Sequence, residues 1–184
     1  MRTSMDGKRI AIFYETAEGH TLVVAERIRE TLAVAGHAAR VTRCRAATAA
    51  DLEGADGFVV GASIHMGKHH ARALKFIERH RAALASRPSA FFSVNLSTKS
   101  RSPERQADAR RYLDELPGLT GWKPDLLASF AGAVPYTRYG FVVRRLMRSI
   151  NEKDGGDTDT SRDFVYTDWE LVEAFALDFE RIVG

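Results

Sequence analysis

The chain has 184 residues, of which 45% are hydrophobic and 28% are charged, and its formal net charge is +3. This length and composition are typical of one globular domain, which we expect to span residues 1–184. No apolar run reaches the ~18 residues of a membrane span, and a single cysteine excludes an internal disulfide. The small net charge does not indicate nucleic acid as a partner. We therefore expect a cytoplasmic protein that contacts membranes only peripherally.

The first strand is predicted over residues 8–14, where β-branched and aromatic residues form a short apolar run. It leads through a turn into a helix predicted over residues 21–35. Such a turn directs free backbone N–H groups and the positive end of the helix dipole toward one point, where a phosphate can bind. An ordinary, well-capped turn is the alternative. The residues expected to bind phosphate are Thr16, Ala17, Glu18, Gly19, His20 and Thr21.

Motifs that the sequence lacks narrow the type of phosphate. Neither G-x-x-x-x-G-K-S/T nor G-x-G-x-x-G is present, which argues against a P-loop and against a dinucleotide fingerprint. The pattern T-x-x-G-x-T at residues 16–21 resembles the FMN-phosphate loop of flavodoxins, where hydroxyls and amides bind the terminal phosphate. Because Glu15 and Glu18 would repel a phosphate, we expect both side chains to point to solvent.

Strands and helices alternate along the rest of the chain. Further strands are predicted at residues 37–42, 57–61, 88–94 and 125–132. Further helices are predicted at residues 73–84, at 107–116, and from a capping box at 167–170 to residue 182. This alternation predicts an α/β, flavodoxin-like three-layer sandwich, with a five-stranded parallel sheet in the order 2-1-3-4-5. The ligand of such a sheet lies at the carboxyl ends of the strands, beside the switch point.

Two more strand ends would meet the first turn there, and we expect their loops to flank a flat flavin ring. The second loop contributes Ala62, Ser63, Ile64, His65, Met66 and Gly67, and the third contributes Val94, Asn95, Leu96 and Ser97. Neither loop has a Trp or Tyr to cover the ring, and Lys68 with three nearby histidines makes the second loop basic. An uncovered ring in a positive field favours a two-electron enzyme over a one-electron shuttle.

Other interpretations of the second loop are weak. The run from Gly61 to His65 has the position of a nucleophile elbow, but its last residue is His, where that turn needs a small residue. His65 and His69 share a helical face, but no carboxylate or thiol lies at ligand spacing. We therefore expect neither a serine hydrolase nor a metal site.

About thirty residues, 133–166, are inserted between the last strand and the last helix. The apolar stripe of a basic amphipathic helix is expected at Tyr139, Val142, Val143, Leu146, Met147 and Ile150, with no acid from residue 131 to 151. Such a helix suits an anionic lipid surface or a carboxylated apolar ligand. Alternatively, the helix docks its stripe on the sheet and leaves its arginines in water. The two interpretations are compatible if the helix walls the flavin site.

Taken as a whole, the chain resembles the flavodoxin-type, quinone-dependent protoporphyrinogen oxidases (dehydrogenases) of bacterial haem biosynthesis. The resemblance spans nearly the whole chain. It is carried by residues 16–21, 60–64 and 88–96, by Tyr136-x-Arg138-Tyr139, and by residues 155–160 and 165–169. Glu15 departs from the family, which tends to have a small hydroxyl residue there. Met66 departs as well, because an aromatic residue is common at that position.

The resemblance implies FMN-dependent removal of six electrons and six protons from protoporphyrinogen IX, giving protoporphyrin IX. Electrons would pass from FMN to a membrane quinone, typically menaquinone, at the inner face of the cell membrane. We expect the propionates to pair with arginines and the tetrapyrrole to pack on tyrosines, and FMN rather than a catalytic side chain to carry the chemistry. The expected substrate-binding residues are Tyr136, Arg138, Tyr139, Arg144, Arg145 and Arg148.

Other functions on the same fold stay open at this point. One is an NAD(P)H:quinone or flavin reductase, and another is a non-catalytic flavodoxin electron carrier whose basic lobe docks an acidic partner. A flavin-free binding module is a third. The sequence leaves open whether the protein forms a homo-oligomer.

Overall fold

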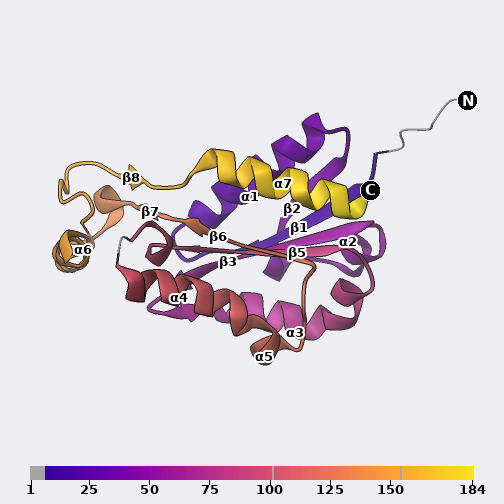
Figure 1. Ribbon diagram of the computed structural model, residues 1–184, viewed down its shortest axis with the longest axis horizontal. Coiled ribbons are helices and arrows are strands. Elements are labelled where there is room, and N and C mark those ends of the chain that lie inside the picture. The colour runs from indigo at the N-terminus through magenta and orange to yellow at the C-terminus, as the bar shows by residue number, and fades with distance from the viewer. Residues whose placement is uncertain (1–6, 101, 154) are drawn as a thin grey trace, which may run out of the picture.

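A parallel sheet runs through the middle of the computed structural model, which describes residues 7–100, 102–153 and 155–184 (Figure 1). Its strand order, β2-β1-β3-β5-β6, confirms the predicted order 2-1-3-4-5. The five strands, all paired in parallel, are β1 Arg9–Glu15, β2 Ala38–Arg43, β3 Gly57–His65, β5 Ser89–Asn95 and β6 Leu126–Ala131. A short strand, β4 Lys68–His69, folds back antiparallel on the end of β3.

Helices cover both faces of the sheet and complete the predicted three layers (Figure 1). One face carries α1 His20–Val34 and α7 Trp169–Val183. The other face carries α2 Ala49–Glu53, α3 Ala71–Ala85, α4 Pro103–Asp114 and α5 Leu116–Thr120. Each face has its own apolar core, because strands covered on both sides present buried side chains to two layers of helices.

Several element boundaries differ from the predictions. The helix predicted to end at Pro117 is followed at once by α5, because proline is tolerated in a first helical turn, and Gly121 ends α5 with a φ of 69°. The N-cap of α7 is Asp168, whose carboxylate accepts from two backbone N–H groups, and not Thr167. Within α7, Val172 and Ala176 are buried, whereas Leu171 and Ile182 are 59% and 40% exposed.

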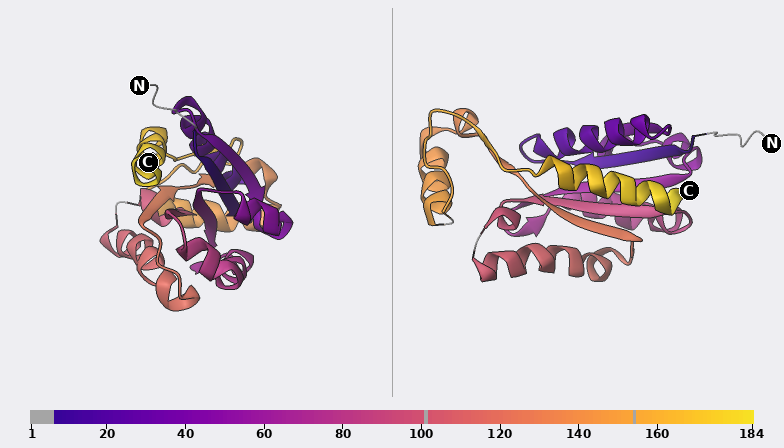
Figure 2. Two further views of the ribbon diagram at one scale, coloured as in Figure 1. Left: turned by 90° about the vertical axis from the view of Figure 1, so that its right-hand side faces the viewer. Right: turned by 45° about the horizontal axis from the view of Figure 1, so that its top comes forward.

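The insertion leaves the sheet as a narrow ribbon. Its elements are β7 Ala133–Val134, the 3₁₀ turn η3 Tyr136–Arg138, α6 Phe141–Lys153 and β8 Phe164–Val165. β7 pairs antiparallel with β8, and together they carry α6 beyond the end of the sheet (Figure 2). The predicted inserted helix therefore exists, but it does not lie on the sheet.

Two observations concern exclusions drawn from the sequence. Cys44 opens the 3₁₀ turn η1 Cys44–Ala46 and is buried, and burial raises the pKa of its thiol to about 12. This thiol is therefore protonated at neutral pH and unreactive. Within the described residues, no helix combines the length and apolar character that crossing a bilayer requires.

Candidate functional site

The first turn connects β1 to α1 at the carboxyl edge of the sheet. The Thr16 hydroxyl accepts a hydrogen bond from the backbone N–H of Gly19 at 2.9 Å. Gly19 is the N-cap of α1 and has a φ of 99°, a conformation that costs a residue with a Cβ but not glycine. The Ala17 N–H donates to the hydroxyl of Ser63 on β3 at 3.1 Å, which joins the first and second loops.

Thr21 stands out in the first turn of α1 because its hydroxyl is buried and has no hydrogen-bond partner among the described residues. A buried hydroxyl without a partner is uncommon, because leaving it unsatisfied costs about 1–3 kcal/mol. The hydroxyl lies at a helix N-terminus, where the first N–H groups are also unsatisfied and the helix dipole favours an anion. An anion bound at this turn would satisfy these donors together, so the turn fits the phosphate predicted from the sequence.

Two side chains of this turn differ from the expectation. Glu15, predicted to point to solvent, is fully buried, and its carboxylate accepts from Nε of Arg43 at 2.5 Å. The neighbouring strand β2 supplies the arginine because Tyr14 and Arg43 are paired in register. This ion pair lowers the cost of burying Glu15. Glu18 is exposed, as predicted, and accepts a hydrogen bond from the Tyr139 hydroxyl at 2.8 Å.

The His20 imidazole is already engaged within the protein. Its Nε2 lies 2.6 Å from the hydroxyl of Thr167, which in turn donates to the carbonyl of Ala131 at 2.6 Å. Because the Thr167 hydroxyl donates its proton to Ala131, it accepts from His20, and we place the ring proton of His20 on Nε2. Burial lowers the pKa of His20, so the ring is neutral at pH 7. Only the backbone N–H of His20 is therefore offered to a phosphate.

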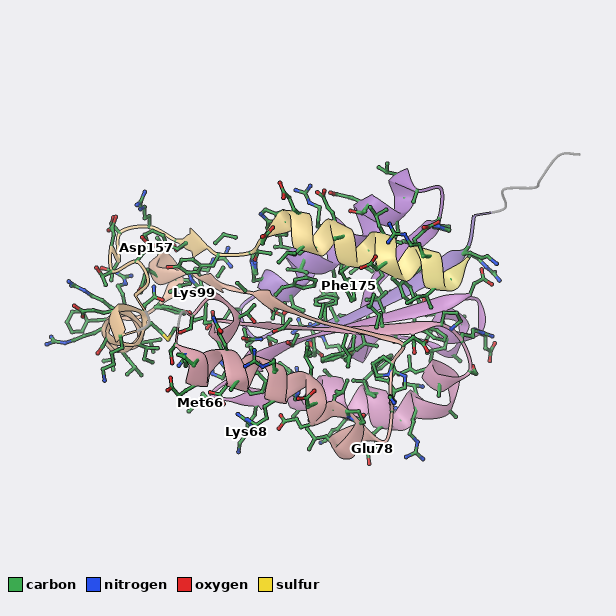
Figure 3. All side chains as sticks on the ribbon, viewed as in Figure 1. Met66, Lys68, Glu78, Lys99, Asp157 and Phe175 are labelled. Atoms are coloured by element: carbon green, nitrogen blue, oxygen red, sulfur yellow. The ribbon has the colours of Figure 1, made fainter. Side chains whose placement is uncertain are left out.

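The second loop is a β-hairpin at the end of β3. Ala62 and Ser63 are buried within the strand, whereas Ile64 is half-buried and His65 is exposed. Met66 and Gly67 form the two-residue turn with φ values of 50° and 74°, and the Met66 side chain is 88% exposed (Figure 3). The strand extends four residues further than the predicted range of 57–61, because β4 pairs with its end.

The second loop carries less positive charge than predicted, because two of its histidines are neutral near pH 7. His69 is buried, its Nε2 lies 2.7 Å from the Tyr112 carbonyl, and burial lowers its pKa. Burial also lowers the pKa of His70, whose Nδ1 accepts from the Arg72 N–H. Because both rings are neutral near pH 7, the fixed positive charge of the hairpin is that of the exposed Lys68.

The third loop is held by a polar cluster around Asn95. The side-chain oxygen of Asn95 accepts from the N–H and hydroxyl of Thr98, and its side-chain amide group donates to Ser129 on β6 at 2.9 Å. Val94, Asn95 and Ser97 are buried, and Leu96 is half-buried. The Asn95 side chain therefore shapes the loop, and a ring lying here would meet backbone groups and Leu96.

The sheet brings the three predicted loops to one edge. Glu15 pairs with Ala62 across β1 and β3, and Ser63 pairs with Val94 across β3 and β5, so the three strands end side by side. A hollow of about 570 Å³ lies between α2 and α3, and none of the predicted site residues lines it. The three predicted loops therefore meet at one edge of the sheet, away from this hollow.

The insertion has a buried polar centre at Asn151, which sequence reasoning missed. Its amide donates to the Tyr136 and Tyr166 hydroxyls and to the Asp157 carbonyl, and its oxygen accepts from Lys99 at 2.6 Å. Lys99 and Asp157 lie at the end of the molecule that carries the insertion (Figure 3). Tyr136, predicted to pack on a tetrapyrrole, is fully buried here and offers no surface to a ligand. The only sequence signal for Asn151 was a polar residue within the run that lacks acids.

Most apolar side chains of α6 face solvent, whereas Met147 and Ile150 are half-buried. Phe141, Val142 and Leu146 are 79%, 77% and 58% exposed, and Asn151 is the only buried residue among the described side chains of the helix. The alternative in which the stripe docks on the sheet is therefore wrong. The reason is that α6 is anchored through the polar network of Asn151, which leaves Phe141, Val142 and Leu146 exposed.

The predicted substrate arginines occupy three different environments. Arg145 and Arg148 are exposed on α6. Arg144 is half-buried and donates from Nη2 to the Tyr139 carbonyl at 2.9 Å, so it supports the start of the helix. Arg138 lies beside the first turn, since a Cβ atom placed on Gly19 would be 4.0 Å from its Nη1. The structure therefore does not bring the four arginines together.

Comparison with known proteins identifies the class to which this fold and site belong. A family model described as a flavodoxin domain matches residues 11–161. A short-chain flavodoxin associated with a bacterial microcompartment superposes with a TM-score of 0.59 at 14% identity, covering 96% of this chain and 99% of that one. Oxidised flavodoxin 1 from Bacillus cereus gives a TM-score of 0.57 at 16% identity, covering 94% and 97%. The chain belongs to the flavodoxin domain family, which implies a flavin cofactor.

Relatives with higher identity define the family more narrowly. Protoporphyrinogen IX dehydrogenase (quinone) of Escherichia coli strain K12 is 35% identical over 174 residues, covering 93% of this chain and 94% of the relative. The protein of the same name from Leishmania major is 34% identical over 176 residues, covering 93% of this chain and 74% of the relative. The chain belongs to this family of flavodoxin-fold oxidoreductases, and the family predicted from the sequence is confirmed.

Proposed function

We propose that this protein catalyses the FMN-dependent oxidation of protoporphyrinogen IX to protoporphyrin IX, with a membrane quinone, menaquinone, as electron acceptor. The observation that carries the proposal is 35% identity across 94% of a relative that bears the name of this activity. The substrate loses six electrons and six protons in three two-electron steps. Each step would convert one quinone to its quinol, so that electrons and protons balance.

The proposed flavin site uses the three loops in different ways. Thr16, Gly19 and Thr21 belong to the turn that would hold the phosphate, with the unpartnered Thr21 hydroxyl as a donor. The backbone of residues 62–67 and 94–97 would border the ring, and the exposed Met66 would leave one ring face accessible. When bound, FMN supplies the two-electron chemistry, and the chain orients it and admits the substrate and the quinone. We assign no side chain as an acid or base.

We assign the outward face of α6 to an anionic membrane surface, where a quinone is found. Its exposed apolar residues, Phe141, Val142 and Leu146, can enter the boundary between headgroups and acyl chains. The exposed Arg145 and Arg148 on the same helix would contribute about 1 kcal/mol each beside anionic lipids. These two arginines are also free to pair with the propionates of a substrate that enters from the membrane.

The direct test is an anaerobic assay of the FMN-loaded protein with protoporphyrinogen IX and a short-chain menaquinone, monitored by porphyrin fluorescence. We expect porphyrin to form at a rate that requires both the protein and the quinone. A reaction without protein measures spontaneous oxidation. Quinone reduction driven by NADH, without porphyrinogen oxidation, would select the NAD(P)H:quinone reductase instead. A purified protein that takes up no FMN would refute the proposal altogether.

A further inference from the structure

The insertion reaches back to the turn predicted to bind the flavin phosphate. Tyr139, which directly follows η3, donates from its hydroxyl to the Glu18 carboxylate at 2.8 Å. Arg138, the last residue of η3, places Nη1 4.0 Å from the position of a Cβ atom on Gly19. Glu18 and Tyr139 are 121 residues apart in the sequence. Two consecutive side chains of the insertion therefore lie against the same turn.

The Arg138 guanidinium is available for an additional ligand. It forms no ion pair within the described part of the chain, and it is exposed. The nearby acid Asp163, whose pKa is lowered by hydrogen bonds from Thr137 and by the charge of Arg138, already accepts from both the N–H and the hydroxyl of Thr137. Because Gly19 has no side chain, a guanidinium can approach the backbone of the turn closely. A planar group with several N–H donors matches the oxygens of a phosphate.

The turn also contains a buried hydrogen-bond donor without a partner, which indicates that a ligand binds there. The buried Thr21 hydroxyl has no partner in the described structure, and it sits in the first turn of a fifteen-residue helix. The two acids of the turn are both occupied: Glu15 is paired with Arg43, and Glu18 accepts from Tyr139. Their repulsion of an incoming dianion is thereby reduced. The turn thus combines a free hydroxyl, a helix N-terminus and a nearby guanidinium.

We propose that Arg138 is a ligand of the flavin phosphate, so that the cofactor site is shared between the first turn and the insertion. The proposal rests on the proposed function in taking FMN as the cofactor. It gives Arg138 a role different from the propionate pairing expected from the sequence. Since only Tyr139 and Gly140 separate Arg138 from α6, the segment that holds the phosphate is continuous with the helix assigned to the membrane.

The test compares FMN with riboflavin, which has the same ring and no phosphate. Dissociation constants of both flavins would be measured by fluorescence quenching with flavin-free wild-type protein, Arg138→Ala and Arg138→Lys. We expect Arg138→Ala to weaken FMN about tenfold and to change riboflavin less than about twofold, because one charge-assisted contact is lost. Arg138→Lys should recover part of the loss. Arg145→Ala, which removes an exposed arginine of α6, is the matched control and should change neither constant.

Salt provides a second measurement on the same proteins. If Arg138 contacts the phosphate, the preference for FMN over riboflavin should fall more steeply with salt in wild type than in Arg138→Ala, since exposed charge pairs are screened. Two results would overturn the proposal. One is an unchanged FMN constant, and the other is an equal loss of FMN and riboflavin affinity, which would show that Arg138 only supports the turn. A wild-type protein that oxidises no porphyrinogen, but whose preference for FMN over riboflavin depends on Arg138, would reject the proposed function and not this assignment.

Discussion

Replacing Thr21 by Val would remove one buried hydroxyl while keeping the shape of the side chain. Thr21 is fully buried, and its Oγ1 has no hydrogen-bond partner among the described residues. Both residues are β-branched, so the helix propensity of α1 changes little. The substitution therefore separates the role of the hydroxyl in binding from its cost to the flavin-free fold.

The magnitude follows from the missing partner. An unsatisfied buried hydroxyl costs about 1–3 kcal/mol, so we expect Thr21→Val to stabilise the flavin-free protein by about 1 kcal/mol or more. For a chain of this size, this corresponds to a rise in Tm of about 2–4 °C per kcal/mol. The same change removes a hydrogen bond to a charged phosphate, worth about 1.5–3 kcal/mol, so FMN affinity should fall roughly tenfold to a hundredfold.

The assay measures thermal unfolding of the flavin-free protein by circular dichroism and FMN affinity by fluorescence quenching. Thr31→Val is the matched control in the same helix, because the Thr31 hydroxyl already donates to the Arg27 carbonyl at 2.9 Å. The control should neither raise the Tm nor weaken FMN. Unchanged FMN affinity in Thr21→Val would refute the assignment of this hydroxyl to the phosphate. A lower Tm would refute the reasoning that the hydroxyl is unsatisfied.

Three further predictions concern the insertion and the buried histidine. The double variant Arg145→Glu with Arg148→Glu should keep its FMN affinity. Its affinity for phosphatidylglycerol vesicles, measured by sedimentation, should fall at least about 30-fold, since two cations contribute about 2 kcal/mol. Neutral vesicles are the control. Asn151→Ala should lower the free energy of local opening of the insertion by about 2–3 kcal/mol, because the hydrogen bonds of its amide are lost. Hydrogen exchange should become faster in the insertion and stay unchanged in the sheet. The pKa of His69 is lowered by burial from 6.5, so the unfolded chain binds its proton first as pH falls. The free energy of unfolding should then drop below about pH 6.5, by at most about 1.4 kcal/mol per pH unit, and urea unfolding should show a shallower drop in His69→Gln.

The sheet was predictable because its signals are local. Short apolar runs separated by helical periods define β1, β3 and β5, and a parallel sheet with right-handed crossovers leaves few possible strand orders. The first turn was also readable, since T-x-x-G-x-T places Gly19 at the one position where a positive φ is needed. The hairpin after β3 was harder to predict, because a two-residue strand such as β4 is too short to show a period.

The insertion shows where periodicity stops being informative. Of the predicted stripe, the residues from Val142 to Ile150 lie on α6, whereas Tyr139 precedes the helix in extended backbone. A period states only which residues share a side of a helix and not what that side contacts. The structure buries Asn151 in a hydrogen-bond network and leaves Phe141 and Leu146 in solvent. Tyr136 was expected to pack on the tetrapyrrole, but the residue is buried and its hydroxyl belongs to this network.

The sequence alone thus determined the alternation of elements, the edge of the sheet at which the three predicted loops meet, and the family. The tertiary structure decided which charges are paired and which segments meet there. Arg43 neutralises Glu15, and Arg138 lies beside Gly19, through contacts between residues far apart in the chain. No local pattern encodes such contacts, because they depend on strand register and on the path of the ribbon that carries α6.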